Sequence, residues 1–235
     1  MNRIVQSTIT SLITLSVFII SLSILTVSAE EVAQDKIVSQ SDTTAAQLLV
    51  KKIGGLKTFE AKFEQRVKNE NGVEIDFTSG KFSIERPDHF RWEVKESFEQ
   101  VIVADGEYLY TYDPELEQVT IQLQNHALAD SPLLLMTSDA EALADAFDIK
   151  LLTLSSAEDG NLFLLKPRKD GNIFSSVHIL FKNNEITELL MADSLGQQTS
   201  VIFSDIRTNI ELPQSLFQFV IPEGVDVIDS REYVE

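Results

Sequence analysis

The residue types that most often hold metals or act as catalysts are absent or scattered in this sequence. The chain has no cysteine, which excludes disulfides, thiolate zinc sites, iron–sulfur clusters and thiol nucleophiles. The three histidines, His89, His126 and His178, lie far apart, and none stands in H-E-x-x-H or another close ligand spacing. No Gly-rich phosphate loop and no G-x-S-x-G elbow occurs. We therefore expect no metal site, no cofactor and no catalytic residue.

Carboxylates are the one reactive residue type in excess, with 37 Asp and Glu residues in a chain of 235. Neighbouring acids such as Asp139 with Glu141, or Glu158 with Asp159, are expected by chance at that density. A secreted hydrolase built on carboxylates would need two of them facing one polar cleft, about 5–10 Å apart. We expect a protein that is not an enzyme, and we keep such a hydrolase as an alternative.

Apolar residues recur at a spacing suited to a sheet with one apolar face. Phe59, Ala61, Phe63 and Val67 alternate with charged residues, and Gln65 is the one polar residue on their face. That pattern is typical of a half-buried strand. Strand-like runs of this kind follow at 82–84, 90–94, 101–103, 108–112, 119–123, 149–154, 162–166, 175–182, 185–192 and 199–206. Residues 217–221 and 225–228 are expected to close the structure.

Turn and helix signals organise these strands. Asn-Gly, Asp-Gly and Asn-Asn pairs separate many of them, which predicts hairpins. Thr43 to Ile53 has a helical period and ends at Gly54-Gly55. Residues 127–147 interrupt the strands with an apolar run after Pro132 and a helix from Ala140 to Phe147. The sequence therefore predicts a mainly β, single-domain, unclosed antiparallel barrel, or half-barrel, whose apolar concave face is covered by a few helices.

The N-terminus predicts export. Arg3 precedes an apolar stretch from Leu12 to Leu25, and Val27-Ser28-Ala29 is a small-residue cleavage site. The alternative is an uncleaved anchor, but the stretch is short for a span of about 20 residues. We expect residues 1–29 to be a cleaved signal peptide, 30–42 a flexible acidic lead-in and 43–235 the functional domain.

The charge balance limits the partners. Residues 1–29 contain one basic residue and no acid, so the remainder carries 18 basic and 37 acidic residues, a net charge of −19. Such a surface repels nucleic acid and anionic lipid head groups. We expect a soluble monomer that binds no nucleic acid.

Three segments resemble the periplasmic lipoprotein carrier family of Gram-negative bacteria, known as LolA. The first contains Arg86-Pro87, then Phe90 and Trp92, in an R-P-x-x-F-x-W pattern. The second runs from Asp105-Gly106 through Tyr108, Tyr110 and Asp113-Pro114 to Gln118-Val119. The third is the closing run from Phe219 to Asp229. Their order and spacing agree with the family from about residue 43 to 230, although the lead-in is longer than the family needs.

The resemblance implies a periplasmic chaperone that binds lipoprotein acyl chains in a hydrophobic cavity. It would take acylated lipoproteins from an inner-membrane ATP-driven (ABC) transporter and pass them to an outer-membrane receptor. The receptor shares the fold but is itself a lipoprotein, so the missing cysteine favours the soluble carrier. The alternative within the same architecture is another periplasmic lipid-binding, glycolipid-binding or sensor module.

The resemblance also assigns roles to residues. It places Arg86 at the cavity mouth, as a latch that donates hydrogen bonds to the lid. We expect the lid helix to contain the apolar run Leu133, Leu134, Leu135 and Met136. We expect the acyl-chain cavity to be walled by aromatic residues on the strands, namely Phe59, Phe63, Phe90, Trp92, Tyr108 and Tyr110.

Overall fold

The computed structural model describes residues 42–124, 140–152, 154, 160–169 and 173–231. The chain divides into two units, Met1–Gln34 and Asp35–Glu235, and every described residue belongs to the second. The predicted signal peptide, the lead-in up to residue 41 and the predicted lid run at 133–136 lie outside the described residues.

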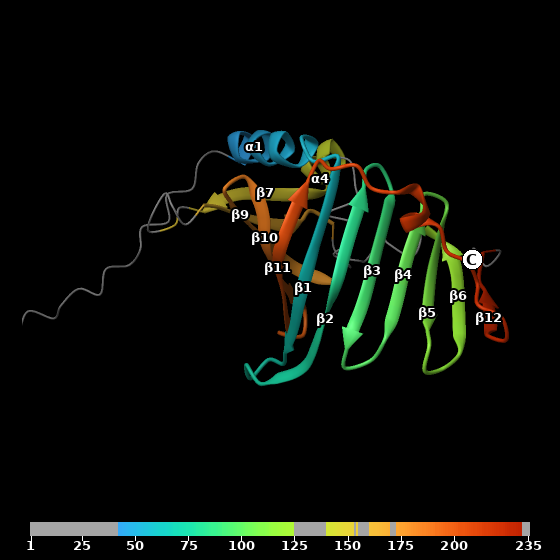
Figure 1. The fold of residues 1–235 in the computed structure, drawn as a ribbon. Coiled ribbons are helices and arrows are strands. Elements are labelled where there is room, and N and C mark those ends of the chain that lie inside the picture. The colour runs from blue at the N-terminus through green and yellow to red at the C-terminus, as the bar shows by residue number, and fades with distance from the viewer. Residues whose placement is uncertain (1–41, 125–139, 153, 155–159, 170–172, 232–235) are drawn as a thin grey trace, which may run out of the picture. The chain divides into compact units, whose positions relative to one another are not determined.

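In the described part of the chain, two α-helices lie at one end of the sheet, where they contact each other and the edge strand β7, Phe147–Leu152 (Figure 1). Helix α1, Asp42–Gly54, buries Ala45, Leu49 and Ile53, which recur every four residues and so share one face. Helix α4, Ala140–Ala146, buries Ala140 and Leu143. Both helices begin and end within one residue of the sequence prediction, and Phe147, predicted to end the second helix, instead begins a strand.

The described strands form one sheet in which chain neighbours are mostly sheet neighbours. Its order is β12-β6-β5-β4-β3-β2-β1-β11-β10-β9-β8-β7. The first strands are β1 Thr58–Lys68, β2 Glu74–Glu85, β3 His89–Glu96, β4 Gln100–Asp105, β5 Tyr108–Asp113 and β6 Gln118–Leu123. The others are β7 Phe147–Leu152, β8 Asn161–Pro167, β9 Phe174–Lys182, β10 Glu185–Asp193, β11 Gln198–Thr208 and β12 Asp226–Asp229.

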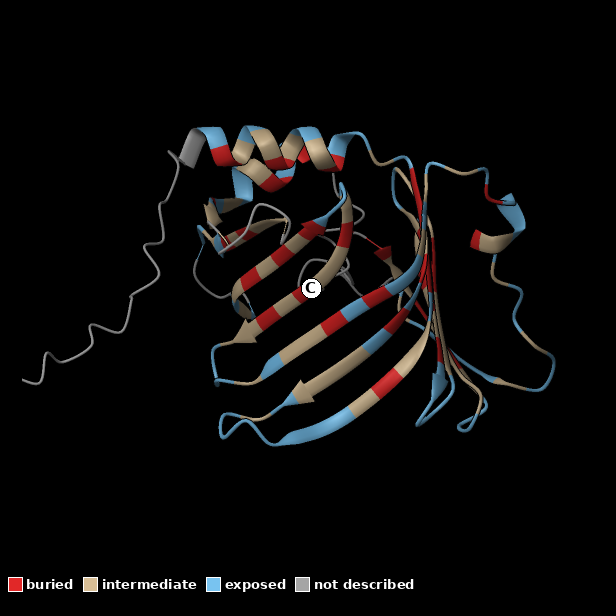
Figure 2. Cartoon of the chain, turned by 60° about the vertical axis from the view of Figure 1, so that its left-hand side comes forward, coloured by how far each residue is buried: buried red, intermediate tan, exposed pale blue. Residues whose placement is uncertain are grey.

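Buried and more exposed residues alternate along most strands, as the banding in Figure 2 shows. We call the face that carries Phe59, Phe82, Trp92 and Phe163 the inner face; it forms one core with the buried residues of α1 and α4. The opposite face is the outer face. Because successive side chains point to opposite sides of a strand, the backbone pairing decides which residues share the core.

The strand β12 does not close the sheet. It pairs with β6 in parallel, Val227 opposite Val119, and so extends one edge while β7 forms the other. All the other pairs are antiparallel. The predicted fold class, a mainly β and unclosed sheet with a few helices on its apolar face, is therefore confirmed. No helix among the described residues is long and apolar enough to cross a membrane.

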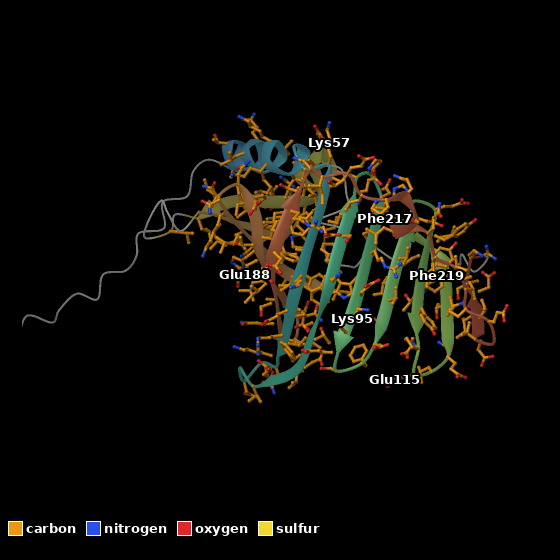
Figure 3. The ribbon with its side chains drawn as sticks, viewed as in Figure 1. Lys57, Lys95, Glu115, Glu188, Phe217 and Phe219 are labelled. Carbon is orange, nitrogen blue, oxygen red and sulfur yellow. The ribbon has the colours of Figure 1, made fainter. Side chains whose placement is uncertain are left out.

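The C-terminal segment crosses the outer face of β3 to β5 before it reaches β12. It contains the 3-10 helix η2, Gln214–Phe217, whose Phe217 is buried against the ring of His89. Phe219 then stacks on Tyr110, with ring centroids 5.4 Å apart. Figure 3 shows both phenylalanines on this segment. The outer face of this half of the sheet is thus partly covered by the chain itself.

Candidate ligand-binding cavity

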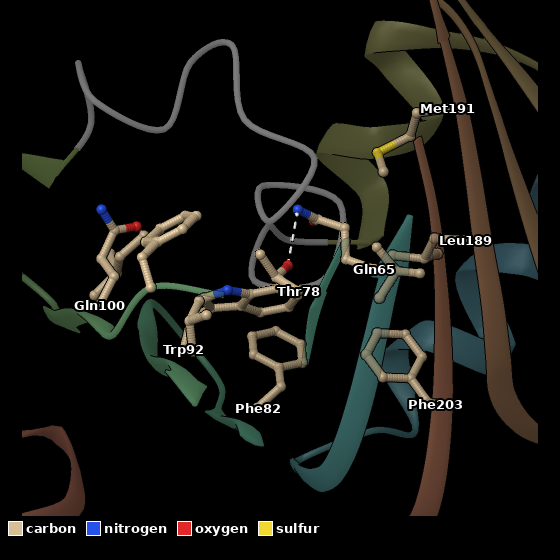
Figure 4. A pocket seen from close by; sticks show the side chains of 12 residues that line it. Gln65, Thr78, Phe82, Trp92, Gln100, Leu189, Met191 and Phe203 are labelled. Carbon is tan, nitrogen blue, oxygen red and sulfur yellow. Dashed lines mark hydrogen bonds between the residues drawn. The ribbon is translucent and has the colours of Figure 1, made fainter. Parts of the chain in front are cut away.

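A cavity of about 230 Å³ lies on the inner face, between strands from the two sides of β1 (Figure 4). On one side its apolar lining consists of Phe82, Trp92, Val94, Phe98 and Ile102, from β2 to β4. On the other side it consists of Leu189 and Met191 of β10 and Val201 and Phe203 of β11. Three polar residues complete the lining, Gln65, Thr78 and Gln100.

The aromatic residues beneath the cavity form a connected cluster. The Phe63 ring stacks on the Trp92 indole, with centroids 3.7 Å apart, and Phe82 meets the same indole edge-on at 5.1 Å. Phe203 stacks on Phe82 at 5.9 Å, and Phe59 contacts both. Such contacts add to the stability that burial of the rings' apolar area gives.

The strand registers bring these residues together. Phe82 lies opposite Trp92, which lies opposite Ile102, so β2, β3 and β4 each place one apolar side chain in the same row. Gly80 lies opposite Phe63, and a Cβ there would come within 3.0 Å of the phenylalanine ring. The absence of a side chain at Gly80 therefore leaves room for the Phe63–Trp92 stack.

Four of the six residues predicted for the cavity wall lie on the inner face. Trp92 lines the cavity, and Phe63 packs against it. Phe59 and Phe90 are both fully buried in the same core, farther along the strands toward α1. Whether any of them touches an acyl chain stays a prediction.

Tyr108 and Tyr110 do not share this face, contrary to the prediction that they wall the cavity. Ala104, on the inner face of β4, pairs with Leu109, so Leu109 is the residue of β5 that points inward and is 7% exposed. The two tyrosines alternate with it and point outward. There Tyr110 stacks on Phe219, and the guanidinium of Arg231 lies 5.2 Å from the Tyr108 ring centroid.

Arg86 lies in the turn between β2 and β3, at the end of the sheet that carries α1. Its backbone N–H donates to the carbonyl of Lys57 at 2.8 Å, which joins this turn to the residue that precedes β1. The predicted partner of its side chain, the lid, lies outside the described residues.

The β10 and β11 part of the lining was not predicted from the sequence. Residues 189–191 are Leu, Leu and Met, so both faces of β10 carry apolar side chains and the alternation is lost. Only the pairing, Leu189 with Val201, shows which face points inward. Phe82 could have been predicted as an inner-face residue, because it alternates with the polar residues Lys81 and Ser83.

Among the described residues of the lining there is no ionisable side chain. Among the described residues, no group of three or more His, Asp or Glu could hold a metal ion. A depression on the outer face contains two carboxylates, but Glu60 is paired with Arg207 and Asp205 with Lys62. His178 also faces outward, among leucines, and burial lowers its pKa from the usual 6.5.

An unclosed sheet with a cavity whose described lining is mostly apolar is typical of proteins that bind apolar ligands. The sequence profile described as "Outer membrane lipoprotein carrier protein LolA" matches residues 54–220, and the chain belongs to that family. This membership agrees with the prediction that the protein is not an enzyme.

Relatives named outer-membrane lipoprotein carrier protein are similar over most of the chain. The one from Chromohalobacter salexigens is 33% identical over 190 residues, which cover 81% of this chain and 89% of the relative. The one from Legionella pneumophila is 37% identical over 187 residues, 79% of this chain and 90% of the relative. A crystal structure of a LolA superfamily protein from Nitrosomonas europaea is 15% identical, covers 74% of this chain and 98% of that chain, and has a TM-score of 0.42. At that score the likeness adds nothing to the family assignment.

Proposed function

We propose that this protein is a periplasmic carrier that binds the acyl chains of lipoproteins in its inner-face cavity. In this function it accepts acylated lipoproteins from an inner-membrane ATP-driven transporter and delivers them to an outer-membrane receptor. The observation that carries the proposal is the cavity of about 230 Å³ whose described lining is mostly apolar, in a chain of the carrier family.

The energetics explain why a carrier is needed. Each acyl CH₂ removed from water gains about 0.8 kcal/mol, so a chain of ~16 carbons gains on the order of 12 kcal/mol when fully buried, an upper bound. A lipoprotein with such chains does not cross an aqueous compartment alone. A carrier supplies a dry surface for the chains, here the Trp92 and Phe82 wall and the facing β10 and β11 side chains.

Displacement of an apolar fluorescent dye tests acyl binding. We expect the dye to bind in the cavity and an acylated lipoprotein to displace it, while the same lipoprotein without its acyl chains leaves it bound. Equal displacement by both forms would contradict recognition of the acyl chains. Because the chain has a single tryptophan, Trp92, its fluorescence reports the cavity directly.

Export to the periplasm is part of the proposal. The Val27-Ser28-Ala29 site supports cleavage after residue 29. Mass spectrometry of the protein from the periplasmic fraction should find Glu30 as the N-terminal residue. A mature form that keeps Leu12 to Leu25 would contradict a soluble carrier.

Arg86 is proposed as the latch that biases a lid toward closure. Its guanidinium has five donors and stays charged, and hydrogen bonds to a charged group contribute about 1.5–3 kcal/mol. Burial of an entering acyl chain can offset that amount, so loading breaks the latch. Because the hydrogen bonds of the closed state are lost on loading, the net affinity for acyl chains is low enough for delivery to the receptor. The turn that holds Arg86 is fixed to the end of the sheet by the Lys57 carbonyl.

Two substitutions test the latch. Arg86→Leu should fold, accept lipoprotein from inner-membrane vesicles and deliver it poorly to receptor-bearing membranes. Arg86→Lys should be intermediate, because an ammonium does not reproduce the planar fork of donors. Delivery by Arg86→Leu at the parental rate would show that Arg86 is not a latch, without contradicting the carrier function.

A further inference from the structure

One polar pair interrupts the apolar wall of the cavity. Gln65 of β1 lies directly opposite Thr78 of β2 on the inner face, and both line the cavity. The Gln65 Nε2 group donates to the Thr78 hydroxyl at 3.4 Å, the bond drawn in Figure 4. Gln65 is the residue that breaks the apolar alternation Phe59, Ala61, Phe63, Val67 along its strand.

This hydrogen bond leaves most of the pair's capacity unused. A side-chain amide has two N–H donors and a carbonyl oxygen, and a hydroxyl has one donor of its own. The distance of 3.4 Å exceeds the usual 2.7–3.2 Å of an N–H···O bond. In the part of the chain that the structure describes, this is the one side-chain hydrogen bond found for either residue. Thr78 is nevertheless only 2% exposed.

Thr78 is buried, but Gln65 is only partly buried, so the unused part of its amide is open to water when the cavity is empty. A ligand that displaces this water must bring polar atoms of its own. Removing a hydroxyl or amide from water without replacing its hydrogen bonds is unfavourable. Valine at 78 and leucine at 65 would continue the apolar surface of Phe82, Trp92 and Val201 at similar volume. The unused donors and the Gln65 Oε1 acceptor therefore suit a ligand that brings a polar group into the cavity.

We propose that Gln65 and Thr78 bind the carbonyl at the head of an acyl chain, so that the cavity recognises acyl groups and not hydrocarbon in general. This inference rests on the proposed carrier function. An ester or amide oxygen accepts hydrogen bonds from Gln65 Nε2–H and the Thr78 hydroxyl, and an amide N–H also donates to Gln65 Oε1. Phe63 lies two residues along the same face, about 7 Å away. The hydrocarbon adjoining the bound carbonyl then lies on the Phe63, Trp92 and Phe82 wall.

Two lipopeptides that differ only in their carbonyl oxygens test this subsite. Both consist of one short peptide, joined to a glycerol that bears either two hexadecanoyl esters or two hexadecyl ethers. The parent protein should bind the ester about 3- to 10-fold more tightly than the ether, the ratio expected for one or two neutral hydrogen bonds. In the variant with Gln65→Leu and Thr78→Val this ratio should fall to about 1, while the ether binds at least as tightly as to the parent. Gln218→Leu, the same change at an exposed position of the C-terminal segment, should leave the ratio unchanged.

A second measurement separates contact from packing. With a ¹³C-labelled ester carbonyl, the carbonyl stretching band of the probe bound to the parent should lie at lower frequency than that of the probe bound to the double variant. A third probe with an N-hexadecanoyl amide distinguishes the two carbonyl sources. If the double variant loses more affinity for the amide probe than for the ester probe, the amide is the preferred group. Equal parental affinity for ester and ether would overturn the subsite alone. If neither lipopeptide displaces the dye, the acyl-carrier function is overturned together with the subsite.

Discussion

At the scale of single residues, Gly80 shows how closely the strands under the cavity approach. A Cβ at this position would lie 1.7 Å from the carbonyl oxygen of Glu93, which belongs to the backbone of β3 and cannot rotate away. Gly80 also sits where the β2–β3 register shifts, next to Ser79. The position thus requires glycine for lack of space and not for its φ angle.

Gly80→Ala should therefore destabilise the protein by about 3 kcal/mol or more, because the added methyl forces β2 and β3 apart. Urea unfolding followed by Trp92 fluorescence measures this loss. Gly54→Ala is the matched control, since nothing lies within 4 Å of a Cβ at the end of α1, and alanine there should be neutral or stabilising by about 0.5–1 kcal/mol. Similar stability of the two variants would contradict the close approach.

His178 gives a second prediction at this scale. It lies on the outer face of β9 between Leu164 of β8 and Leu190 of β10, and Lys166, Lys182 and Glu188 are the charged groups nearby. Burial lowers its pKa below the usual 6.5, and Lys166 adds to this effect. Below about pH 6.5 the unfolded chain then binds more protons at this residue than the folded chain does, so stability falls as the pH decreases.

The His178→Gln variant should lose less stability than the parent between pH 7 and pH 5. Urea unfolding at several pH values measures the difference, in which the titration of the many carboxylates cancels. A difference between parent and variant that does not change with pH would show that His178 does not titrate differently in the folded state.

At the scale of elements, local patterns predicted the strands and helices but not every face. The helix at 43–53 and the hairpins follow from period and turn residues, and the structure contains them. Tyr108 and Tyr110 were predicted to wall the cavity, yet Leu109 between them is the core residue of β5. Which face of a strand is inner depends on pairing with Ala104, and a segment distant in sequence, Phe217 to Phe219, covers the tyrosines. Neither the pairing nor the covering segment can be recognised from the sequence of β5 alone.

That covering segment yields a prediction about elements. Phe217 is 1% exposed, so Phe217→Ala should cost about 3 kcal/mol or more by leaving a cavity against β3 and β4. Phe219 is partly exposed between Tyr110 and Tyr112, so Phe219→Ala should cost about 1 kcal/mol. Urea unfolding of the two variants and the parent measures these losses of stability. Because both lie on the outer face, dye binding should stay parental in each, and a loss of dye binding would mean that the segment also shapes the cavity.

At the scale of the whole sheet, the size of the cavity bears on how it is loaded. The cavity of about 230 Å³ is smaller than the roughly 300–1,000 Å³ of sites for small ligands, and an acyl-laden lipoprotein needs at least that range. Its lining comes from β2 to β4 on one side of β1 and from β10 and β11 on the other. The sheet is not closed, so no hydrogen-bonded ring of strands opposes a movement of these two sides apart.

We therefore expect loading to separate the two sides of the sheet. Since the chain has no cysteine, Glu115→Cys in the turn after β5 and Leu195→Cys in the turn after β10 provide two unique sites for spin labels. Both positions are exposed and neither lines the cavity. The distance between the labels, measured by pulsed electron paramagnetic resonance, should increase when the diester lipopeptide binds and stay constant with the peptide that lacks acyl chains. If the distance stays constant while Trp92 fluorescence reports binding, the cavity grows by side-chain rearrangement around Trp92 and Met191, and the strands keep their positions.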